Sequence, residues 1–444
     1  MIDRRSMLAG ASAAAALAAS PVLARPAKGT APVAPRAFPK GFLWGAATAG
    51  HQVEGNNVNA DVWVLEHVQP TIFSEPSGDA CNSFALWATD LDLAKAMGLT
   101  AYRFSLEWPR IEPEEGLFSI AMLDHYKAII EGARARGLTP VVTFNHYTTP
   151  RWFATRGGWT NPEAPSFFAR FCEKAARHLA AHIGYATTLN EPNIMNVLRV
   201  ILPPPVFQLQ SAMLAAAAKA NACAKFAAGN AIDLPDINIA TTHLIAGHKA
   251  GRAAIKAVRP DLPVGCSLSM FGDEAVGANS VIGGMRAELY GPWLEAVRGD
   301  DFLGVQNYER VLWGSAGRVP APKGAVLNRS GGEVYAPSLA MAARYAHQVS
   351  GCPIMVTEHG VDTTDDTIRA ALIPAALAEL HKAMAEGLPV LGYVHWSLID
   401  NFEWISGMKG KLGLHAVDPV TFARTPKPSA GVLGAIARAN AVTA

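Results

Sequence analysis

One stretch decides the fold prediction: Ala186-Thr187-Thr188-Leu189-Asn190-Glu191-Pro192-Asn193. Its first four residues are apolar or threonine and predict a buried β-strand. Pro192 ends that strand, because proline has no backbone donor for the next ladder bond. Glu191 therefore comes at the C-terminal end of the strand, where it is better placed to face a pocket than to pack. A glutamate before a proline also occurs at helix starts, so this stretch alone leaves a helix-capping role for Glu191 open.

A second predicted strand far downstream ends in the same way. The residues Ile354-Met355-Val356-Thr357-Glu358-His359-Gly360 form an apolar run followed by a carboxylate and then a glycine. Two carboxylates at the ends of two strands are a candidate pair for acid/base or nucleophilic catalysis. This second ending makes a pocket-facing role the better interpretation of Glu191.

Strands and helices alternate along the rest of the chain. The helical periodicity is clear at 84–97, 124–136, 165–182, 239–258 and 368–386, and an extra helix at 208–228 belongs to an insertion after the fourth strand. Eight strands alternating with helices predict a parallel sheet, and a closed (β/α)8 TIM barrel, an α/β fold with elaborated βα loops, is its most economical form. We therefore predict one domain over residues 38–444, with strands at 42–47, 101–105, 140–145, 186–189, 264–270, 302–306, 353–357 and 390–396.

Polar side chains follow seven of these eight strands, and only the fifth lacks an obvious one. Reactive residues of such barrels gather at the C-terminal ends of the strands, so this concentration predicts a site there. Solubility alone does not explain it. The residues are Gln52, Glu54, Arg103, Asn145, His146, Asn190, Glu191, Gln306, Tyr308, Glu358 and Trp396.

The N-terminus has the pattern of an export signal. Arg4-Arg5 precedes an apolar stretch from Met7 to Ala19, and Val22-Leu23-Ala24 fits the small-residue rule for cleavage. We predict a twin-arginine signal peptide over residues 1–24 and a disordered, Pro- and Ala-rich tether over 25–37. A periplasmic or secreted location follows, without stable membrane insertion after cleavage. An uncleaved anchor is the alternative.

Composition narrows the function classes. The formal net charge is +1, so nothing indicates a nucleic-acid partner or an acidic membrane surface. The five cysteines have no metal-type spacing, and no His, Cys or Asp cluster has ligand spacing, so we expect neither a metal nor a cofactor. We expect the cysteines to be mostly buried small hydrophobic residues. Nothing in the sequence fixes the oligomeric state.

Several motifs together resemble glycoside hydrolase family 1, the β-glucosidase-type enzymes, over nearly all of the chain after the signal. They begin with the block Phe38–Ala49, continue through Tyr102-Arg103-Phe104-Ser105, Leu189-Asn190-Glu191-Pro192 and Thr357-Glu358, and close with Gly392–Trp404. The order and spacing of these motifs carry the resemblance more than any one of them, and the closing block is the most specific.

The resemblance implies retaining hydrolysis of a β-glycoside, with Glu358 as nucleophile and Glu191 as acid/base. Retention needs the two carboxyls roughly 5 Å apart, and we expect strands four and seven to present them from opposite sides of the barrel. Arg103 and Tyr308 match positions that hold the nucleophile. For Arg103, an ordinary buried ion pair is the alternative.

The resemblance also implies a set of sugar-binding residues. Amide and carboxylate side chains grip neighbouring hydroxyls, and indole faces cover the C–H side of a pyranose. For His146 and for the tryptophans, plain core packing is the alternative. A carboxylate at Glu403 predicts non-phosphorylated substrates, because it would repel a phosphate. The set is Gln52, His146, Asn190, Trp396, Glu403 and Trp404.

Four departures from the family pattern stand out. His359 replaces the usual Asn after the nucleophile and is expected to alter pocket polarity, Tyr147 replaces a common Trp, and Gln306 replaces an Asn. The segment after Asn193 is short, with three prolines at 203–205, and predicts an open aglycone side that accepts bulky or aromatic aglycones.

The function most consistent with these residues is an exported exo-β-glycosidase. A β-glucoside is the best single substrate prediction, with β-galactosides and β-fucosides open. Two other functions remain: a transglycosylase that uses the same site, and a non-catalytic carbohydrate-binding protein on the same barrel. Both candidate carboxylates are present, which disfavours the second.

Overall fold

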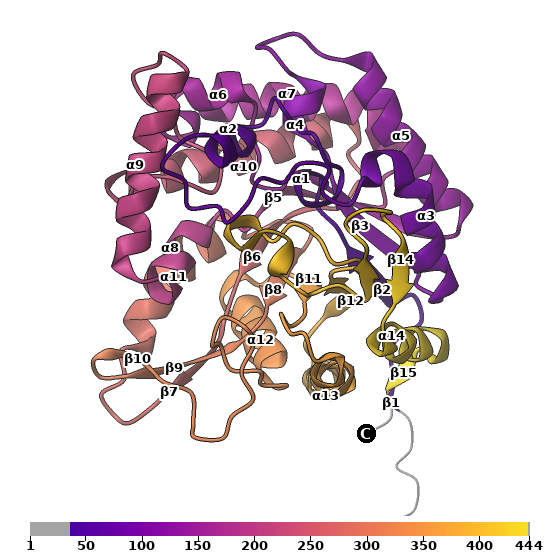
Figure 1. Ribbon diagram of the computed structural model, residues 1–444. Helices are drawn as coiled ribbons and strands as arrows, with labels where there is room; N and C mark the ends of the chain where they lie inside the picture. Colours follow the sequence, from indigo (N-terminus) through magenta and orange to yellow (C-terminus); the bar gives the residue numbers. More distant parts are fainter. Residues whose placement is uncertain (1–35, 443–444) are drawn as a thin grey trace, which may run out of the picture. The chain divides into compact units, whose positions relative to one another are not determined.

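The computed structural model describes residues 36–442, and eight of its strands form a closed barrel (Figure 1). All eight neighbouring pairs are parallel, and the strands follow one another around the barrel in sequence order. The TIM-barrel prediction is confirmed. The barrel strands are β2 (Leu43–Ala47), β3 (Ala101–Ser105), β4 (Thr139–Asn145), β5 (Tyr185–Asn190), β6 (Val264–Ser269), β8 (Leu303–Asn307), β11 (Ile354–His359) and β12 (Val390–Trp396).

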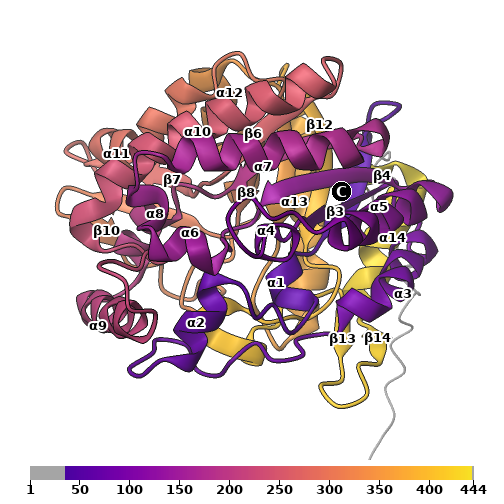
Figure 2. The same ribbon diagram turned by 90° about the horizontal axis from the view of Figure 1, so that it is seen from above.

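Helices surround the barrel, and the predicted ones, apart from the extra helix after the fourth strand, lie within a few residues of their expected bounds (Figures 1 and 2). The longer helices are α3 (Ser83–Ala96), α5 (Ile120–Ala135), α7 (Ala164–Leu179), α10 (Ile237–Val258), α11 (Ile282–Ala296), α12 (Ser338–Ser350), α13 (Asp366–Ala385) and α14 (Pro428–Ala439). Shorter ones in the loops are α1 (Gly50–Val53), α2 (Asp61–His67), α4 (Trp108–Ile111) and α6 (Arg151–Thr155), with 3-10 turns at 158–160, 180–182, 234–236 and 404–409.

The outer helices pack closely where one side has small residues. A Cβ atom on Gly247 of α10 would lie 2.7 Å from the Trp159 ring, and one on Gly251 would lie 2.8 Å from the Phe168 ring. A glycine inside a helix costs about 1 kcal/mol relative to alanine. The close approach of α10 to Trp159 and to Phe168 of α7 explains why these two positions are glycine.

Two additions extend the barrel, and residues of the first line the cavity described below. After β5 the chain forms α8 (Ile194–Ile201) and α9 (Pro204–Ala220), and α9 packs against α2 through a second apolar cluster that includes Val62, Leu65 and Met213. The second addition is a three-stranded sheet that the sequence reading did not predict. It contains β7 (Gly272–Ala275), β9 (Arg310–Gly314) and β10 (Gly317–Val319).

The predicted extra helix over 208–228 is wrong at both ends. Three prolines move its start forward, because proline is well accommodated in the first turn of a helix, and α9 begins at Pro204. The helix ends at Ala220, and Ala222 then adopts a left-handed backbone with φ 50°. The chain then returns, and the backbone of Lys225 forms an isolated parallel β-bridge with that of Arg156.

The predicted tether over 25–37 is wrong at its last two residues. Arg36 and Ala37 form β1 (Arg36–Ala37), which pairs antiparallel with β15 (Ala441–Val442) near the other end of the chain. The pairing satisfies backbone groups that a disordered segment would leave to water. The predicted signal peptide, residues 1–24, and the rest of the tether lie outside the described residues.

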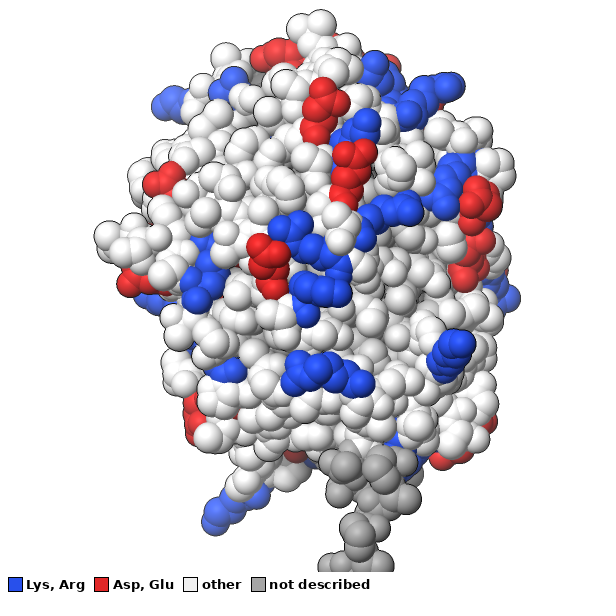
Figure 3. All heavy atoms as spheres, turned by 90° about the vertical axis from the view of Figure 1, so that its right-hand side faces the viewer, with Lys and Arg blue, Asp and Glu red and all other residues white. Residues whose placement is uncertain are grey.

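On the right-hand side of Figure 1, where α3, α5 and α14 lie, acidic and basic side chains are interspersed (Figure 3). A short hairpin, β13 (His415–Val417) and β14 (Arg424–Pro426), lies near these helices. All five cysteines are free thiols, four of them buried, as expected for small hydrophobic residues. Between residues 36 and 442, none of the helices has the length and apolar character needed to span a membrane.

Candidate active site

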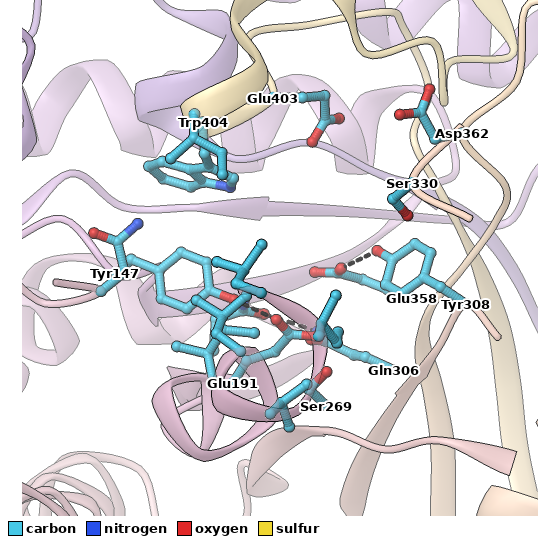
Figure 4. Close-up of a pocket in the computed structure, with 18 of the residues that line it drawn as sticks. Tyr147, Glu191, Ser269, Gln306, Tyr308, Ser330, Glu358, Asp362, Glu403 and Trp404 are labelled. Atoms are coloured by element: carbon cyan, nitrogen blue, oxygen red, sulfur yellow. Dashed lines mark hydrogen bonds between the residues drawn. The ribbon is translucent and has the colours of Figure 1, made fainter. Parts of the chain in front are cut away.

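A cavity of about 340 Å³ opens at the C-terminal ends of the barrel strands (Figure 4). The structure brings all ten predicted site residues to it. Arg103 lies beneath the cavity, fully buried, and contacts two of the residues that line it. The other nine line the cavity directly: Gln52, His146, Asn190, Glu191, Tyr308, Glu358, Trp396, Glu403 and Trp404.

Glu191 projects into the cavity because the backbone turns sharply after β5. Its N–H bonds the Ser267 carbonyl at 2.8 Å, and its φ of 41° is left-handed, which few residues other than glycine adopt. Such backbone angles persist where the surrounding structure imposes them, often at functional sites. The Tyr147 hydroxyl, itself on a residue with φ 67°, donates to Oε2 of Glu191. The other oxygen, Oε1, is buried without a hydrogen-bond partner in the protein.

Glu358 is held by two donors. Nη1 of Arg103 lies 2.6 Å from Oε1, and the Tyr308 hydroxyl lies 2.5 Å from Oε2. Arg103 is itself fixed, since its Nε bonds Thr143 at 3.1 Å and its Nη2 bonds the Asn190 side-chain oxygen at 2.6 Å. One guanidinium thus joins the strand end that carries Glu358 to the strand end that carries Glu191. Arg103 does form a buried ion pair, and its partner Glu358 lines the cavity.

The expectation that the two carboxyls come from opposite sides of the barrel is wrong. Two strands, β6 and β8, separate β5 from β11, so the two are three positions apart in a ring of eight. The side chains meet because both point inward over the mouth, and they face the same cavity in Figure 4. A register shift precedes each carboxylate, between Thr187 and Asn190 and between Val356 and Glu358.

The surroundings of the two carboxyls place the proton. Burial, and then the charge of Glu358, raise the pKa of Glu191 to about 8. Burial also raises the pKa of Glu358, but Arg103, Tyr308 and Gln306 oppose this by stabilising the charged form. The proton of the pair is therefore favoured on Glu191, while the donors around Glu358 favour its charged form. This division supplies one acid and one nucleophile.

Several buried polar atoms on the cavity wall have no partner within the protein. They include Gln52 Oε1, His146 Nδ1 and Gln306 Oε1, in addition to Glu191 Oε1. Burial lowers the pKa of His146 well below its usual value, so the ring is neutral. Its Nε2 faces the Asn190 amide nitrogen at 3.3 Å and accepts from it, which leaves the proton on Nδ1. Buried polar groups are normally paired, so this wall is built to bind a ligand rich in hydroxyls.

Aromatic and acidic groups adjoin these polar atoms on the lining. The Trp396 and Trp404 rings stack on either side of His146, with centroid distances of 5.6 Å and 6.2 Å. The Trp396 indole N–H donates to Glu403 at 3.1 Å, and the Gln52 amide lies 3.3 Å from the other Glu403 oxygen. Burial raises the pKa of Glu403 to about 8, so this carboxyl also carries a proton at neutral pH and donates as well as accepts.

The comparisons with known proteins agree with this geometry. The profile described as glycosyl hydrolase family 1 matches residues 34–248 and 339–442, well over half of the chain. The chain belongs to glycosyl hydrolase family 1. Family 1 members are enzymes, so the protein is a glycoside hydrolase.

Solved and curated relatives extend over most of the chain. A crystal structure of the β-glycosidase BGL167 has 46% identity and a TM-score of 0.86, covering 91% of this chain and 98% of that one. An apo β-glucosidase structure has 40% identity and a TM-score of 0.87, covering 90% and 98%. Thermostable β-glucosidase B of Thermobispora bispora is 28% identical, over 88% of this chain and 89% of its own length.

The structure corrects three details of the family 1 site prediction. Ser269 ends β6, which is the fifth strand of the barrel. It lines the cavity and lowers the pKa of Glu191, so the fifth barrel strand does have a polar end. Glu54 and Asn145 do not line the cavity: Glu54 pairs with Arg110 and Tyr126, and Asn145 bonds the Thr148 carbonyl. His359 does not change the cavity lining, since its Nδ1 bonds the Tyr393 hydroxyl at 2.9 Å.

Tyr147 was noted only as a departure from the pattern, and Gln306 as a departure and a strand-end residue, yet both support the site. The Gln306 amide donates to the Asn190 oxygen at 2.7 Å, which orients Asn190 beside Glu191. Only the spacing of a phenol next to His146 could have pointed to Tyr147 in advance. Within residues 36–442, no group of three or more His, Cys, Asp or Glu side chains is arranged to hold a metal ion.

Tyr147→Phe is expected to shift the alkaline limb of activity to higher pH. The phenol donates to Glu191 and so stabilises its charged form, which lowers the pKa of Glu191. Without this donor the pKa rises further, and the acid form persists to higher pH. The pH profile of kcat/KM measures the shift. The matched control is Tyr126→Phe, because the Tyr126 hydroxyl bonds Glu54 outside the cavity. A limb that stays in place or moves to lower pH contradicts this role.

Proposed function

We propose that the protein is a retaining exo-β-glycosidase that hydrolyses non-phosphorylated β-glycosides, with β-glucosides preferred, through a covalent glycosyl-enzyme. The observation that supports this is that two carboxyls with different hydrogen-bond partners line one cavity. Glu358 is buried and paired with Arg103, while the proton of the pair is favoured on Glu191. Relatives named as β-glucosidases and a β-glycosidase support the same substrate class.

In the first step, Glu358 attacks the anomeric carbon and forms an ester, while Glu191 protonates the leaving oxygen. Arg103 and Tyr308 hold the attacking carboxylate in one orientation. Asn190 lies next to Glu191 and bonds Arg103 through its side-chain oxygen. Its amide would donate to the sugar 2-hydroxyl, a hydrogen bond that strengthens in the transition state.

In the second step, Glu191 acts as a base. Esterification removes the charge of Glu358, and that charge is the second largest cause of the raised pKa of Glu191. The pKa of Glu191 therefore falls, the carboxyl loses its proton, and it can accept one from the incoming water. Attack of water on the ester releases a sugar with retained β configuration and restores Glu358.

Gln52, His146, Trp396, Glu403 and Trp404 would bind the non-reducing sugar and close the cavity beyond it, which fits exo action. A phosphate on that sugar would meet Glu403 and Asp362 on the lining, and Asp362 is already paired with Arg329 at 2.8 Å. Without a free cation among the residues that line the cavity, a phosphate dianion would be buried unpaired.

A panel of aryl β-glycosides tests the proposed function. We expect hydrolysis of 4-nitrophenyl β-glucoside, and a first sugar product of β configuration by NMR. We expect the 6-phosphorylated glucoside to be at least about 100-fold poorer in kcat/KM, because its phosphate dianion would be buried without a cation to pair with it. Galactoside and fucoside arms rank the sugar preference. A first product of α configuration would overturn the retaining mechanism, and equal rates on the phosphorylated glucoside would overturn the role of Glu403.

We further propose that the protein is exported through the twin-arginine route and acts in the periplasm or outside the cell. The support is the sequence of residues 1–24 alone. Expressed in a bacterium that has this route, the chain is expected in the periplasmic or secreted fraction with Arg25 at its N-terminus. Arg4→Lys combined with Arg5→Lys should retain it in the cytoplasm. Export that persists in this double variant, or a membrane-bound uncut chain, contradicts the proposal.

A further inference from the structure

The helix α8 turns an aliphatic face to the cavity. Ile194, Val197, Leu198 and Ile201 recur at helical spacing and all line it. The lining continues with Leu202 and with Val206 at the start of α9. Between residues 194 and 231, the only hydrogen-bonding side chains on the lining are Gln210 and Asn230, and no aromatic side chain of this segment lines it.

The position of this wall relative to the acid/base carboxyl is fixed by the chain. The helix α8 starts three residues after Glu191 and leads away from it, so each turn lies farther from the scissile bond. From Ile194 to Ile201 the helix advances about 10 Å. A single ring attached to the glycosidic oxygen would contact the first turn, whereas a longer skeleton would reach Leu198 and Ile201.

The wall is poorly suited to a second sugar. The amide nitrogen of Gln210 is already used by the Ile232 carbonyl at 2.9 Å, which leaves Asn230, whose Oδ1 is buried without a partner, as the main group of this segment for the hydroxyls of a sugar aglycone. Hydroxyls buried against aliphatic side chains without partners are destabilising. The other side, with Trp396, Trp404 and the unpaired polar atoms, differs in having both indoles and hydrogen-bonding groups.

We propose that this wall binds a large alicyclic aglycone, such as the fused saturated rings of a steroid or terpenoid. The inference rests on the proposed function, since it places the glycosidic oxygen at Glu191. It narrows the sequence-based expectation of bulky or aromatic aglycones. The wall formed by α8 and the start of α9 is aliphatic and offers no aromatic face for stacking; the phenyl rings on the lining, Phe73 and Phe271, come from other segments.

A pair of alkyl glucosides with matched leaving groups tests the proposal. Cyclohexyl β-D-glucoside and a saturated steroid 3-β-D-glucoside both leave as secondary ring alcohols and differ only in the remaining rings. Each additional buried CH₂ is worth about fourfold, so we expect kcat/KM to be at least about tenfold higher for the steroid glucoside. Cellobiose should be poorer than the steroid glucoside. A steroid glucoside no better than the cyclohexyl one overturns the proposal.

Variants locate the effect on α8. In Leu198→Gln and Ile201→Gln the steroid-to-cyclohexyl ratio of kcat/KM should fall at least about tenfold, whereas Arg199→Gln, on the exposed side of the same helix, should keep the wild-type ratio. Glutamine has a helix propensity close to that of leucine, so α8 itself is preserved. A ratio unchanged in both lining variants overturns the proposal.

A binding measurement separates this inference from the proposed function. The steroid glucoside should raise the Tm of the Glu358→Ala variant, and Leu198→Gln in that background should remove the rise. If wild type hydrolyses no aryl β-glycoside but this shift appears, the proposed hydrolysis fails and the aliphatic wall stands. If 4-nitrophenyl β-glucoside is hydrolysed and no such shift appears, the wall proposal fails alone.

Discussion

Glu358→Ala is expected to lower kcat for every β-glycoside by at least about 10⁴-fold, the scale seen when a catalytic nucleophile is removed. The variant loses the only ionised carboxylate that Arg103 and Tyr308 hold against the cavity. Its removal also leaves room for a small anion at the same face of the sugar. Added azide should therefore restore turnover of an activated aryl β-glucoside and yield the α-glycosyl azide.

The stereochemistry is the informative readout, because loss of activity alone also follows from misfolding. Arg103 would remain buried next to the removed charge, so circular dichroism and Tm accompany the assay. A matched control is Glu309→Ala, which removes another buried carboxyl from the cavity lining without touching Arg103. Its effect on kcat should be far smaller. A β-glycosyl azide from Glu358→Ala, or no rescue in a folded variant, contradicts the nucleophile assignment.

The fold could be predicted from the sequence because each barrel strand is a short apolar run that ends at a polar residue. A strand such as β11 is buried throughout and begins with the apolar run Ile354-Met355-Val356. The sheet formed by β7, β9 and β10 could not be predicted in this way. Its strands are short, and β10 has three partly exposed residues, so no hydrophobic pattern marks it. The end of α9 depends on the left-handed turn at Ala222, which alanine does not signal.

The two carboxyls and the sugar-binding set could be predicted because they follow strand ends and match family motifs. The contacts that tune them could not, because they join positions far apart in sequence. Gln306 bonds Asn190 across 116 residues, and Tyr147 donates to Glu191 across 44 residues, with a left-handed backbone at both of these last two residues. The separation of the strands that carry the pair did follow from the predicted order, since strands four and seven are three positions apart in a ring of eight. Strand order gives neighbours, while inward orientation at the mouth decides which tips meet.

Glu191→Ala is expected to separate substrates by leaving group. Without the acid, kcat/KM for alkyl β-glucosides should fall about 10²- to 10⁴-fold, the usual contribution of general acid–base catalysis. For 4-nitrophenyl β-glucoside the first step needs little protonation, so the glycosyl-enzyme still forms and then accumulates. Azide should attack this ester and yield the β-glycosyl azide, the opposite anomer from that of the Glu358→Ala variant.

The pH profile gives an independent test of the same residue. A pKa of about 8 means that the active, protonated form of Glu191 prevails below pH 8 and is lost as the pH rises through it. Wild-type kcat/KM for an alkyl glucoside should therefore fall about tenfold per pH unit above this value, and Glu191→Ala should lack that limb. Because burial and the charge of Glu358 both raise this pKa, neutralising Glu358 should move the limb to lower pH. The Glu358→Gln variant, although slow, retains enough shape to measure this by direct titration of Glu191. A Glu191 pKa that is unchanged or higher in that variant would show that the charge of Glu358 does not act on Glu191. The acid/base assignment would then fail.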